Sequence, residues 1–349
     1  MSTDSTRRPE RVSVSHASEG PPLDAFSDPL LVDPEPSLLR AVVESFRVAA
    51  PALVDPDIDE LRAAATADGD PLAEPTRLPS LTVLADETVV DEVTDEFRAA
   101  SQLAALVEAD ICQLLTGISV QPNPVLAGQN RGCVLVPITG EGGGGSDDGT
   151  DGGDADVDGD LDGDADVDGD RDAEPDADGD RRTARDPDRW VPIGDDPSLG
   201  ARYAALIEAN ADVEPYGLRT PSRHRVYAAF RNRCDAALAD GVIRAIDADP
   251  GPNGDRRADA RARAYAMGVC HGALDGDLRR ACEDAGLGSR STFTRIKREL
   301  REAGLLATES VPQPVGRPRE RLVARGALAN AEGEPPSPAA VVEAARNAL

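Results

Sequence analysis

The sequence predicts an α/β domain followed by a C-terminal domain of helices and one β-hairpin, with an acidic insertion inside the first domain. Short apolar runs alternate with stretches of helical periodicity over residues 30–250, which is typical of strands and helices packed in layers. An Asp- and Gly-rich stretch interrupts that pattern over residues 140–189. Two amphipathic helices joined by a tight turn, and then two short strands, lie within residues 251–325.

The first domain is expected to follow a polar, proline-containing stretch, residues 1–29, which is predicted to be disordered. Apolar residues fall on one face of a predicted helix over 37–50, and Ser37 is expected to be its N-cap. Further helices are predicted over 87–107 in two pieces, 199–209 and 222–246, and strands over 81–84, 111–115, 133–138 and 190–193. Strands that alternate with helices in this way favour an α/β fold.

The insertion contains a repeated Asp-Ala-Asp-Val-Asp-Gly-Asp segment that starts at Asp154 and again at Asp164. Its spacing matches the opening of a calcium-binding loop, but the position that needs a bidentate Glu holds Ala165 in one repeat and Pro175 in the other. No predicted helix flanks either repeat. We therefore expect a solvated, disordered acidic linker in a strand-to-strand loop, with weak, nonspecific cation binding as the alternative.

Residues 278–306 predict two helices and a tight turn. Gly286 is expected to end the first helix in the left-handed conformation, with Leu287 entering the core, and Ser289 is expected to cap the second helix. The apolar positions are Leu278, Ala281, Cys282 and Ala285 on the first helix and Phe293, Ile296 and Leu300 on the second. A hairpin with a proline-rich tip near 316–319 follows, so residues 251–325 predict a winged helix-turn-helix, with a tail over 326–349.

The charge of this region is opposite to that of the whole chain. The chain has 37 basic and 65 acidic residues, a formal net charge of −28, and Lys297 is its only lysine. Residues 256–325 hold 15 basic and 9 acidic residues, a local charge of +6, which favours binding to the phosphates of double-stranded DNA. The residues expected to contact DNA are Arg290, Ser291, Thr292, Thr294, Arg295, Lys297 and Arg298 on the second helix and Arg317, Arg319 and Arg321 on the wing.

The acidity of the whole chain is typical of proteins that stay soluble in concentrated salt, which predicts a salt-loving microbial source. Residues 1–20 lack the apolar segment of a signal peptide, and no apolar run approaches the ~20 residues that a membrane helix needs. The five cysteines form no C-x-x-C pair, which favours buried thiols in a reducing compartment. We therefore expect a cytoplasmic protein without a membrane partner.

Enzyme motifs are missing from the sequence. It has no G-x-x-x-x-G-K-[ST] loop, no G-x-S-x-G and no H-E-x-x-H, and no lysine precedes Lys297. The histidines His16, His224 and His271 are scattered and lack metal-ligand spacing. The sequence therefore predicts a protein that is not an enzyme and that uses neither a metal nor a cofactor.

Several segments resemble a known family. Residues 291–300, 304–312 and 315–319, the last of which reads Val-Gly-Arg-Pro-Arg, are similar to the haloarchaeal transcriptional regulator family TbsP, and 84–90, 97–101 and 217–221 resemble the N-terminal domain of that family. The resemblance covers about 36–138 and 190–325; the insertion departs from the family pattern. It implies a regulator of central-metabolism or growth-state genes, with an N-terminal α/β domain that senses or dimerises.

Two rival functions stay open beside sequence-specific regulation by a homodimer with a small-molecule effector on its N-terminal domain. One is a protein-interaction adaptor whose helix-turn-helix packs on another protein, and the other is an enzyme with an unrecognised α/β site. Charge reversal of Arg295 and Arg298 separates a regulator from an adaptor, because only a regulator would lose its binding to DNA.

Concentrated salt constrains how the protein can bind DNA. If about six DNA phosphates were neutralised, the affinity for DNA would fall by roughly seven decades between about 0.1 M and 2 M salt. DNA binding in concentrated salt is therefore expected to depend on base contacts.

Overall fold

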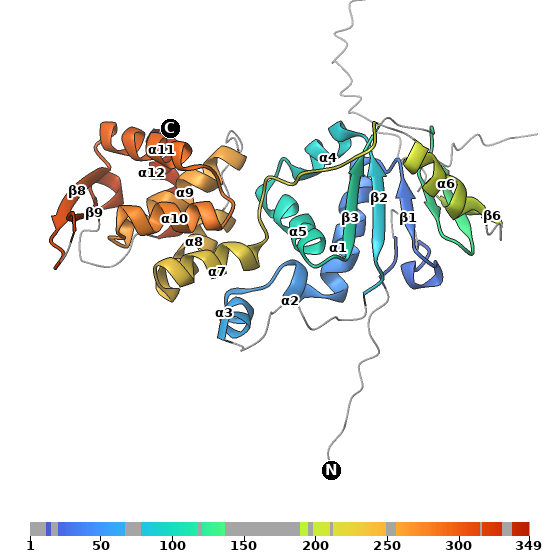
Figure 1. Cartoon of the computed structure of the whole chain (residues 1–349), viewed down its shortest axis with the longest axis horizontal. Coiled ribbons are helices and arrows are strands. Elements are labelled where there is room, and N and C mark those ends of the chain that lie inside the picture. Colours follow the sequence, from blue (N-terminus) through green and yellow to red (C-terminus); the bar gives the residue numbers. More distant parts are fainter. Residues whose placement is uncertain are drawn as a thin grey trace, which may run out of the picture. The chain divides into compact units, whose positions relative to one another are not determined.

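The computed structural model describes residues 12–14, 20–66, 78–117, 121–136, 189–194, 198–209, 212–248, 256–314, 316–329 and 337–348. The calcium-like repeats, almost all of the acidic insertion and His16 lie outside these residues. Within them the chain forms a sheet-bearing N-terminal part and a helical C-terminal part that carries a hairpin (Figure 1). The predicted fold class, an α/β domain followed by a winged helix-turn-helix, is confirmed.

The N-terminal part is built on a seven-stranded mixed sheet with strand order β6-β5-β4-β1-β2-β3-β7. The strands are β1 (Leu30–Val32), β2 (Leu81–Ala85), β3 (Cys112–Thr116), β4 (Val125–Ala127), β5 (Gly132–Val136), β6 (Arg189–Gly194) and β7 (Glu214–Pro215). β1, β2 and β3 run parallel, and every other neighbouring pair is antiparallel. The parallel strands are joined by helical connections, as a parallel pair requires.

Helices cover both faces of this sheet. They are α1 (Pro36–Ala49), α2 (Pro51–Val54), α4 (Glu87–Thr94), α5 (Phe97–Glu108) and α6 (Ser198–Ala209), whereas α3 (Ile58–Thr66) packs through Leu61 on helices of the C-terminal part. Leu31, Val83 and Leu114 point to the face that α1 and α5 cover, whereas Leu30 and Leu84 pack with residues of α6 on the other face. This alternation is the two-residue period of a strand buried on both sides. The helix predicted from Ser37 begins at Pro36, with Glu35 as its N-cap.

The predicted disorder of residues 1–29 is wrong for 12–14 and 20–29, which pack on the sheet domain. Val12 and Val14 are buried. Leu23, the first residue of a short 3-10 helix (Leu23–Ala25), and Phe26, which follows that helix, have their side chains in the same core. The indole Nε1 of Trp190 donates a hydrogen bond to the Val14 carbonyl at 3.0 Å. Val12 and Val14 are two residues apart in a polar stretch, and their burial attaches this stretch to the core of the sheet domain.

Residues 137–188 connect β5 to β6, which are antiparallel neighbours in the sheet. The expected position of the insertion, between two strands of one domain, is therefore confirmed. The predicted strand over 133–138 is described as far as Val136, and its last two residues lie outside the described part of the chain.

Among the described residues, the C-terminal part consists of six α-helices, a 3-10 helix and a hairpin. Its elements are α7 (Arg223–Arg233), α8 (Ala236–Asp247), α9 (Arg256–Cys270), α10 (Asp275–Asp284), α11 (Arg290–Glu302), β8 (Leu306–Val311), β9 (Arg319–Ala324), a 3-10 helix (Gly326–Leu328) and α12 (Pro338–Ala348). The sequence predicted one helix over 222–246, but the structure has two helices there, because α7 ends at Arg233 and α8 begins at Ala236. Asp235 caps α8 there, because its carboxylate accepts a hydrogen bond from the Leu238 backbone N–H at 2.7 Å.

One apolar core joins helices that the sequence analysis assigned to three different regions. Phe230 of α7 and Val242 of α8 lie in the same buried cluster as Phe293 of α11. Leu328 and Val341, from the stretch predicted to be a tail, are fully buried in that cluster as well. The core therefore starts before residue 251 and continues beyond residue 325, the boundaries predicted for the winged domain.

Helices α9 and α10 approach closely at Gly268. A Cβ atom at this position would lie 2.4 and 2.5 Å from the two Cδ atoms of Leu278, a fully buried side chain of α10. At Gly276 of α10 an added Cβ would meet nothing within 4 Å. Alanine substitutions at the two glycines therefore separate the effect of close packing from the effect of helix propensity.

We expect Gly268→Ala to lower the free energy of unfolding by about 1–3 kcal/mol, because the new methyl group overpacks the core. The control Gly276→Ala is expected to raise it by up to about 1 kcal/mol, because alanine favours the helix and the space is open. Urea denaturation of both variants checks the pair, and equal shifts in the same direction would contradict the close approach.

Candidate nucleic-acid interface

The turn between α10 and α11 has the geometry expected of a helix-turn-helix. Gly286 has a φ of +78°, the left-handed conformation that glycine adopts most easily at a helix end. The Leu287 backbone N–H then donates to the Cys282 carbonyl at 3.0 Å, and the Leu287 side chain is buried. Ser289 is the N-cap of α11 as predicted, although its hydroxyl lies 2.8 Å from Ser291 Oγ and bonds no backbone N–H of the helix.

Helix α11 is strongly two-sided. Phe293, Ile296 and Leu300 are buried, and the Phe293 ring stacks on Tyr265 of α9 with 6.0 Å between the ring centroids. The opposite face is exposed at Arg290, Ser291, Thr294, Arg295 and Arg298, with Thr292 half-buried beside it. The structure thus brings together all the predicted contact residues of this helix except one.

Lys297 is the exception, because it lies against the protein. Its side chain is only 15 % exposed, and its Nζ lies 3.0 Å from Asp275 Oδ2 and 2.6 Å from Glu320 Oε2. The residue follows buried Ile296 directly, so it points to the flank of α11 that faces α10 and the hairpin. Its predicted place on the exposed face is wrong.

Asp275, at the start of α10, holds the three helices of this motif together. Its buried carboxylate accepts hydrogen bonds from the Tyr265 hydroxyl at 2.7 Å and from Arg279 Nη2 at 2.6 Å, beside the ion pair to Lys297. Burial, reinforced by the nearby Asp275 charge, raises the pKa of Tyr265 far above its usual value, so the phenol stays a donor. The sequence analysis did not predict this role of Asp275. The one signal for it was its partner Lys297, the only lysine in a chain whose other basic side chains are mostly arginines.

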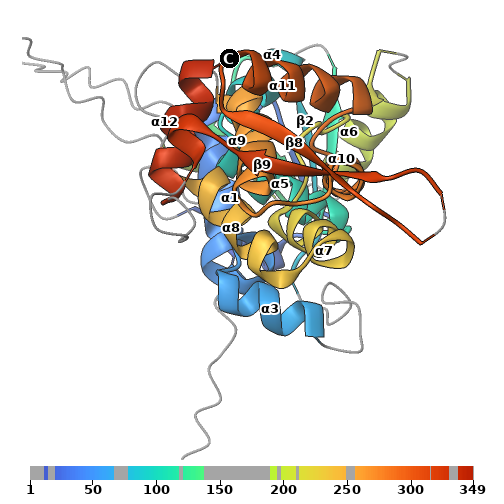
Figure 2. The same ribbon diagram turned by 90° about the vertical axis from the view of Figure 1, so that its left-hand side faces the viewer.

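The wing is attached to the helix-turn-helix by backbone pairing. Strands β8 and β9 pair from Leu306↔Ala324 to Val311↔Arg319. The residue that precedes α10, Leu274, forms a β-bridge to Arg321, and the Leu322 N–H donates to the Ala273 carbonyl at 2.9 Å. Figure 2 shows the hairpin extending away from the helices. Its tip exposes Arg317 and Arg319, and Arg321 is exposed on β9.

Carboxylates of the same domain pair with several of these arginines. Arg295 Nη1 lies 3.0 Å from Glu299 Oε1, and Arg298 Nε lies 3.8 Å from Glu302 Oε1, both one helical turn along α11. On the wing, Arg319 Nη1 lies 3.1 Å from Asp277 Oδ2 of α10. All three arginine side chains are at least half exposed, so the pairs can open to a partner.

The described part of the sheet domain contains an open cavity with a volume of about 830 Å³. It lies at the carboxyl ends of β2 and β3, where Thr116 and Gly117 end the second of these strands. Its acidic lining residues are Asp86, Glu87, Asp91, Asp95, Asp212 and Glu214. A negative field of this kind disfavours an anionic ligand.

The histidines and cysteines fit packing roles in the described structure. His224 Nε2 lies 2.9 Å from the Ala52 carbonyl, and burial lowers the pKa of both His224 and His271. Burial raises the pKa of the Cys112 thiol to about 12 and that of Cys282 well above its usual value. No group of three or more His, Cys, Asp or Glu side chains that could hold a metal occurs among the described residues. Within the same residues, no helix is both long and apolar enough to cross a membrane.

A glycine-ended turn, an arginine-bearing helix opposite an apolar face and a paired hairpin define a winged helix-turn-helix protein, the class to which many transcription regulators belong. The C-terminal helix-turn-helix domain of TbsP-like transcriptional regulators matches residues 222–345, and the N-terminal domain of the same regulators matches residues 38–149. The chain belongs to this family of TbsP-like transcriptional regulators. No curated protein and no solved structure matches the chain significantly.

Proposed function

We propose that the protein regulates transcription by sequence-specific binding to double-stranded DNA, with α11 in the major groove and the wing on the neighbouring backbone. The observation that carries the proposal is the exposed arginine face of α11, directly opposite the buried Phe293, Ile296 and Leu300. A helix anchored on one side and basic on the other can enter the groove without losing its packing.

The proposal gives each exposed side chain of this surface a role. Arg290, Arg295 and Arg298 contact base edges or phosphates, and an arginine that pairs bidentately with guanine discriminates by about 1–3 kcal/mol. Ser291, Thr292 and Thr294 supply shorter polar contacts from the same face. Arg317, Arg319 and Arg321 hold the wing against the backbone or the minor groove. Lys297 is left out of this set, because its side chain is only 15 % exposed and lies against Asp275 and Glu320.

Selection from sheared genomic DNA tests the proposal. Wild-type protein is expected to enrich a few promoter fragments, and Arg295→Ala/Arg298→Ala is expected to bind those fragments about 100-fold more weakly, since two groove contacts are lost. Unfolding midpoints of both proteins verify that the variant is folded. Retention of full affinity by the folded variant would contradict the assignment of α11.

The hypothesis that the protein is a protein-interaction adaptor predicts a different outcome of the selection from genomic DNA. An adaptor enriches no DNA fragment, and charge reversal of Arg295 and Arg298 removes a protein partner instead. The basic face in a chain of net charge −28 favours the regulator, because phosphate binding needs a local positive charge.

The same proposal includes five further properties of the protein. It forms a homodimer, binds a small-molecule effector on its sheet domain, controls central-metabolism or growth-state genes, comes from a haloarchaeon and is located in the cytoplasm. Sedimentation with and without an enriched fragment tests the dimer, and the fragments themselves identify the genes. We also propose residue 222 as the start of the DNA-binding domain, which the shared core of α7, α8 and α11 supports.

A further inference from the structure

Three arginines of the proposed DNA-binding surface are paired with carboxylates in the isolated protein. Arg295, Arg298 and Arg319 each have a carboxylate partner within the C-terminal part: Glu299, Glu302 and Asp277, at 3.0, 3.8 and 3.1 Å. Two of these carboxylates lie on α11 itself, four residues after the arginine that each one pairs with.

We infer that Glu299 and Glu302 act as built-in counter-ions of Arg295 and Arg298 and determine how strongly, and with what salt dependence, the protein binds DNA. This inference rests on the proposed function. It assigns a role to residues that the recognition face itself does not require.

The exposure of each pair supports an exchange with DNA phosphate. The side chains of Arg295 and Arg298 are 57 % and 60 % exposed, so solvent screens both pairs and each contributes little to stability. The pair between Lys297 and Asp275 is different, because both side chains are mostly buried and hold the fold. Phosphate oxygens can therefore replace Glu299 and Glu302 as partners while α11 stays packed in the core through its own Phe293 and Leu300.

A counter-ion that stays near the DNA changes the thermodynamics of binding. A cation that neutralises a phosphate releases bound salt cations, which steepens the dependence of log K on log salt by about 0.9 per phosphate. When the carboxylate remains beside its arginine, the net charge brought to the phosphate is close to zero, and little salt is released. Affinity is then weaker in dilute salt and changes less with concentration, so nonspecific binding to phosphates is held down.

The test compares full-length wild type with Glu299→Gln/Glu302→Gln on a mixed-sequence duplex and on a fragment enriched by the wild type. Affinities are measured from about 0.1 M to about 1 M KCl. The variant is expected to steepen the salt slope by about 1.8 and to bind the mixed-sequence duplex up to about 60-fold more tightly at about 0.1 M, with the two proteins converging near 1 M.

A matched control carries the same change of charge elsewhere. Glu208→Gln/Glu343→Gln alters two exposed carboxylates, one on α6 and one on α12, that pair with no arginine among the described residues. It is expected to keep the wild-type slope. Asp277→Asn, which frees Arg319 on the wing, is expected to steepen the slope by about 0.9 independently.

Three outcomes would overturn the inference. An unchanged slope in Glu299→Gln/Glu302→Gln, while the wild type binds DNA and Arg295→Ala/Arg298→Ala does not, overturns the inference and leaves the proposed function intact. Loss of affinity for the enriched fragment in the glutamine variant also overturns it, because the carboxylates would then be contacting base amino groups. Absence of wild-type binding at every salt concentration overturns the proposed function together with the inference.

Discussion

Asp275→Ala is expected to lower the free energy of unfolding by about 3–5 kcal/mol, because it removes one partner of a buried ion pair. The Asp275 side chain is 4 % exposed, and its removal leaves the Tyr265 hydroxyl and Arg279 Nη2 without the acceptor that they share. Lys297 would keep only Glu320, whose side chain is 56 % exposed. Chemical denaturation measures the loss.

Two further variants separate charge from hydrogen bonding at this position. Asp275→Asn keeps an acceptor for Tyr265 but loses the charge that faces Arg279 and Lys297, so we expect it to fall between alanine and wild type. The control Asp284→Ala removes a carboxylate at the other end of α10 that is 46 % exposed in its pair with Arg233, and we expect a change within about 1 kcal/mol. If Asp275→Ala were as mild as that control, Asp275 would not hold the motif together.

The helix-turn-helix was predictable because its signals are local. Gly286, the apolar spacing of Phe293, Ile296 and Leu300, and the position of Ser289 all lie within one short run of sequence. Each constrains the backbone or the buried face of a single helix, so no distant contact was needed to interpret it.

The errors concern residues whose environment comes from distant parts of the chain. Lys297 was placed on the exposed face by helical periodicity, but Glu320, which lies 23 residues away on β9, pairs with it. Val12 and Val14 were read as disordered because the core that buries them, including Trp190, is assembled from segments far along the sequence. Side-chain direction across an interface depends on what packs beside it, which periodicity alone does not contain.

The break between α7 and α8 was different, since a local signal existed. Asp235 precedes Leu238 by three residues, the spacing of an N-cap whose carboxylate accepts a backbone N–H. The apolar pattern over 222–246 runs through this break without interruption, so it predicts a single helix. The bend lets α7 and α8 pack on each other and on α9 and α10 in one core.

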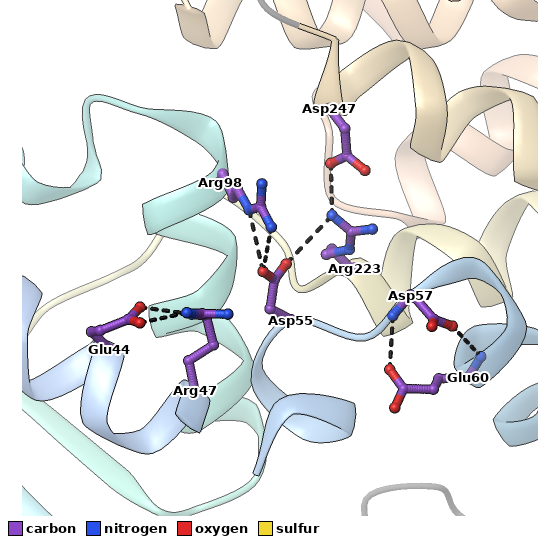
Figure 3. A network of polar contacts seen from close by, with 8 residues as sticks. All are labelled: Glu44, Arg47, Asp55, Asp57, Glu60, Arg98, Arg223 and Asp247. Atoms are coloured by element: carbon purple, nitrogen blue, oxygen red, sulfur yellow. Dashed lines mark hydrogen bonds and ion pairs between the residues drawn. The ribbon is translucent and has the colours of Figure 1, made fainter. Parts of the chain in front are cut away.

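That core also contacts the sheet domain, and charges accompany the contact. Leu61 of α3 and Phe97 of α5 lie in the apolar cluster of the C-terminal helices. The described residues of the sheet domain and of the C-terminal helices therefore form one compact unit. Figure 3 shows the ion pairs beside it, in which Arg223 of α7 lies between two carboxylates. Its Nη1 is 2.7 Å from Asp247 Oδ1 and 3.5 Å from Asp55 Oδ1.

We expect Arg223→Met to lower the free energy of unfolding by about 3 kcal/mol, measured by urea denaturation at about pH 7. Arg223 is 8 % exposed and Asp55 4 %, so the variant leaves Asp55 with Arg98 alone and Asp247 without its nearest cation. The control Arg244→Met changes an exposed arginine on α8 and is expected to stay within about 0.5 kcal/mol of wild type.

The pH dependence of this loss provides a second check. Burial raises the pKa of Asp247, and Arg223 partly lowers it again, so removal of Arg223 raises that pKa further. Between its unfolded and folded pKa values, the folded state binds more protons at Asp247 than the unfolded state does, and the contribution of this group to stability therefore declines as pH rises through that window. The window is wider in Arg223→Met, so the variant should recover part of its lost stability, relative to wild type, as pH falls from about 7 to about 5. A gap between the two proteins that widened on acidification would mean that the pKa of Asp247 is not raised further when Arg223 is removed, and would contradict the role of Arg223 as its counter-ion.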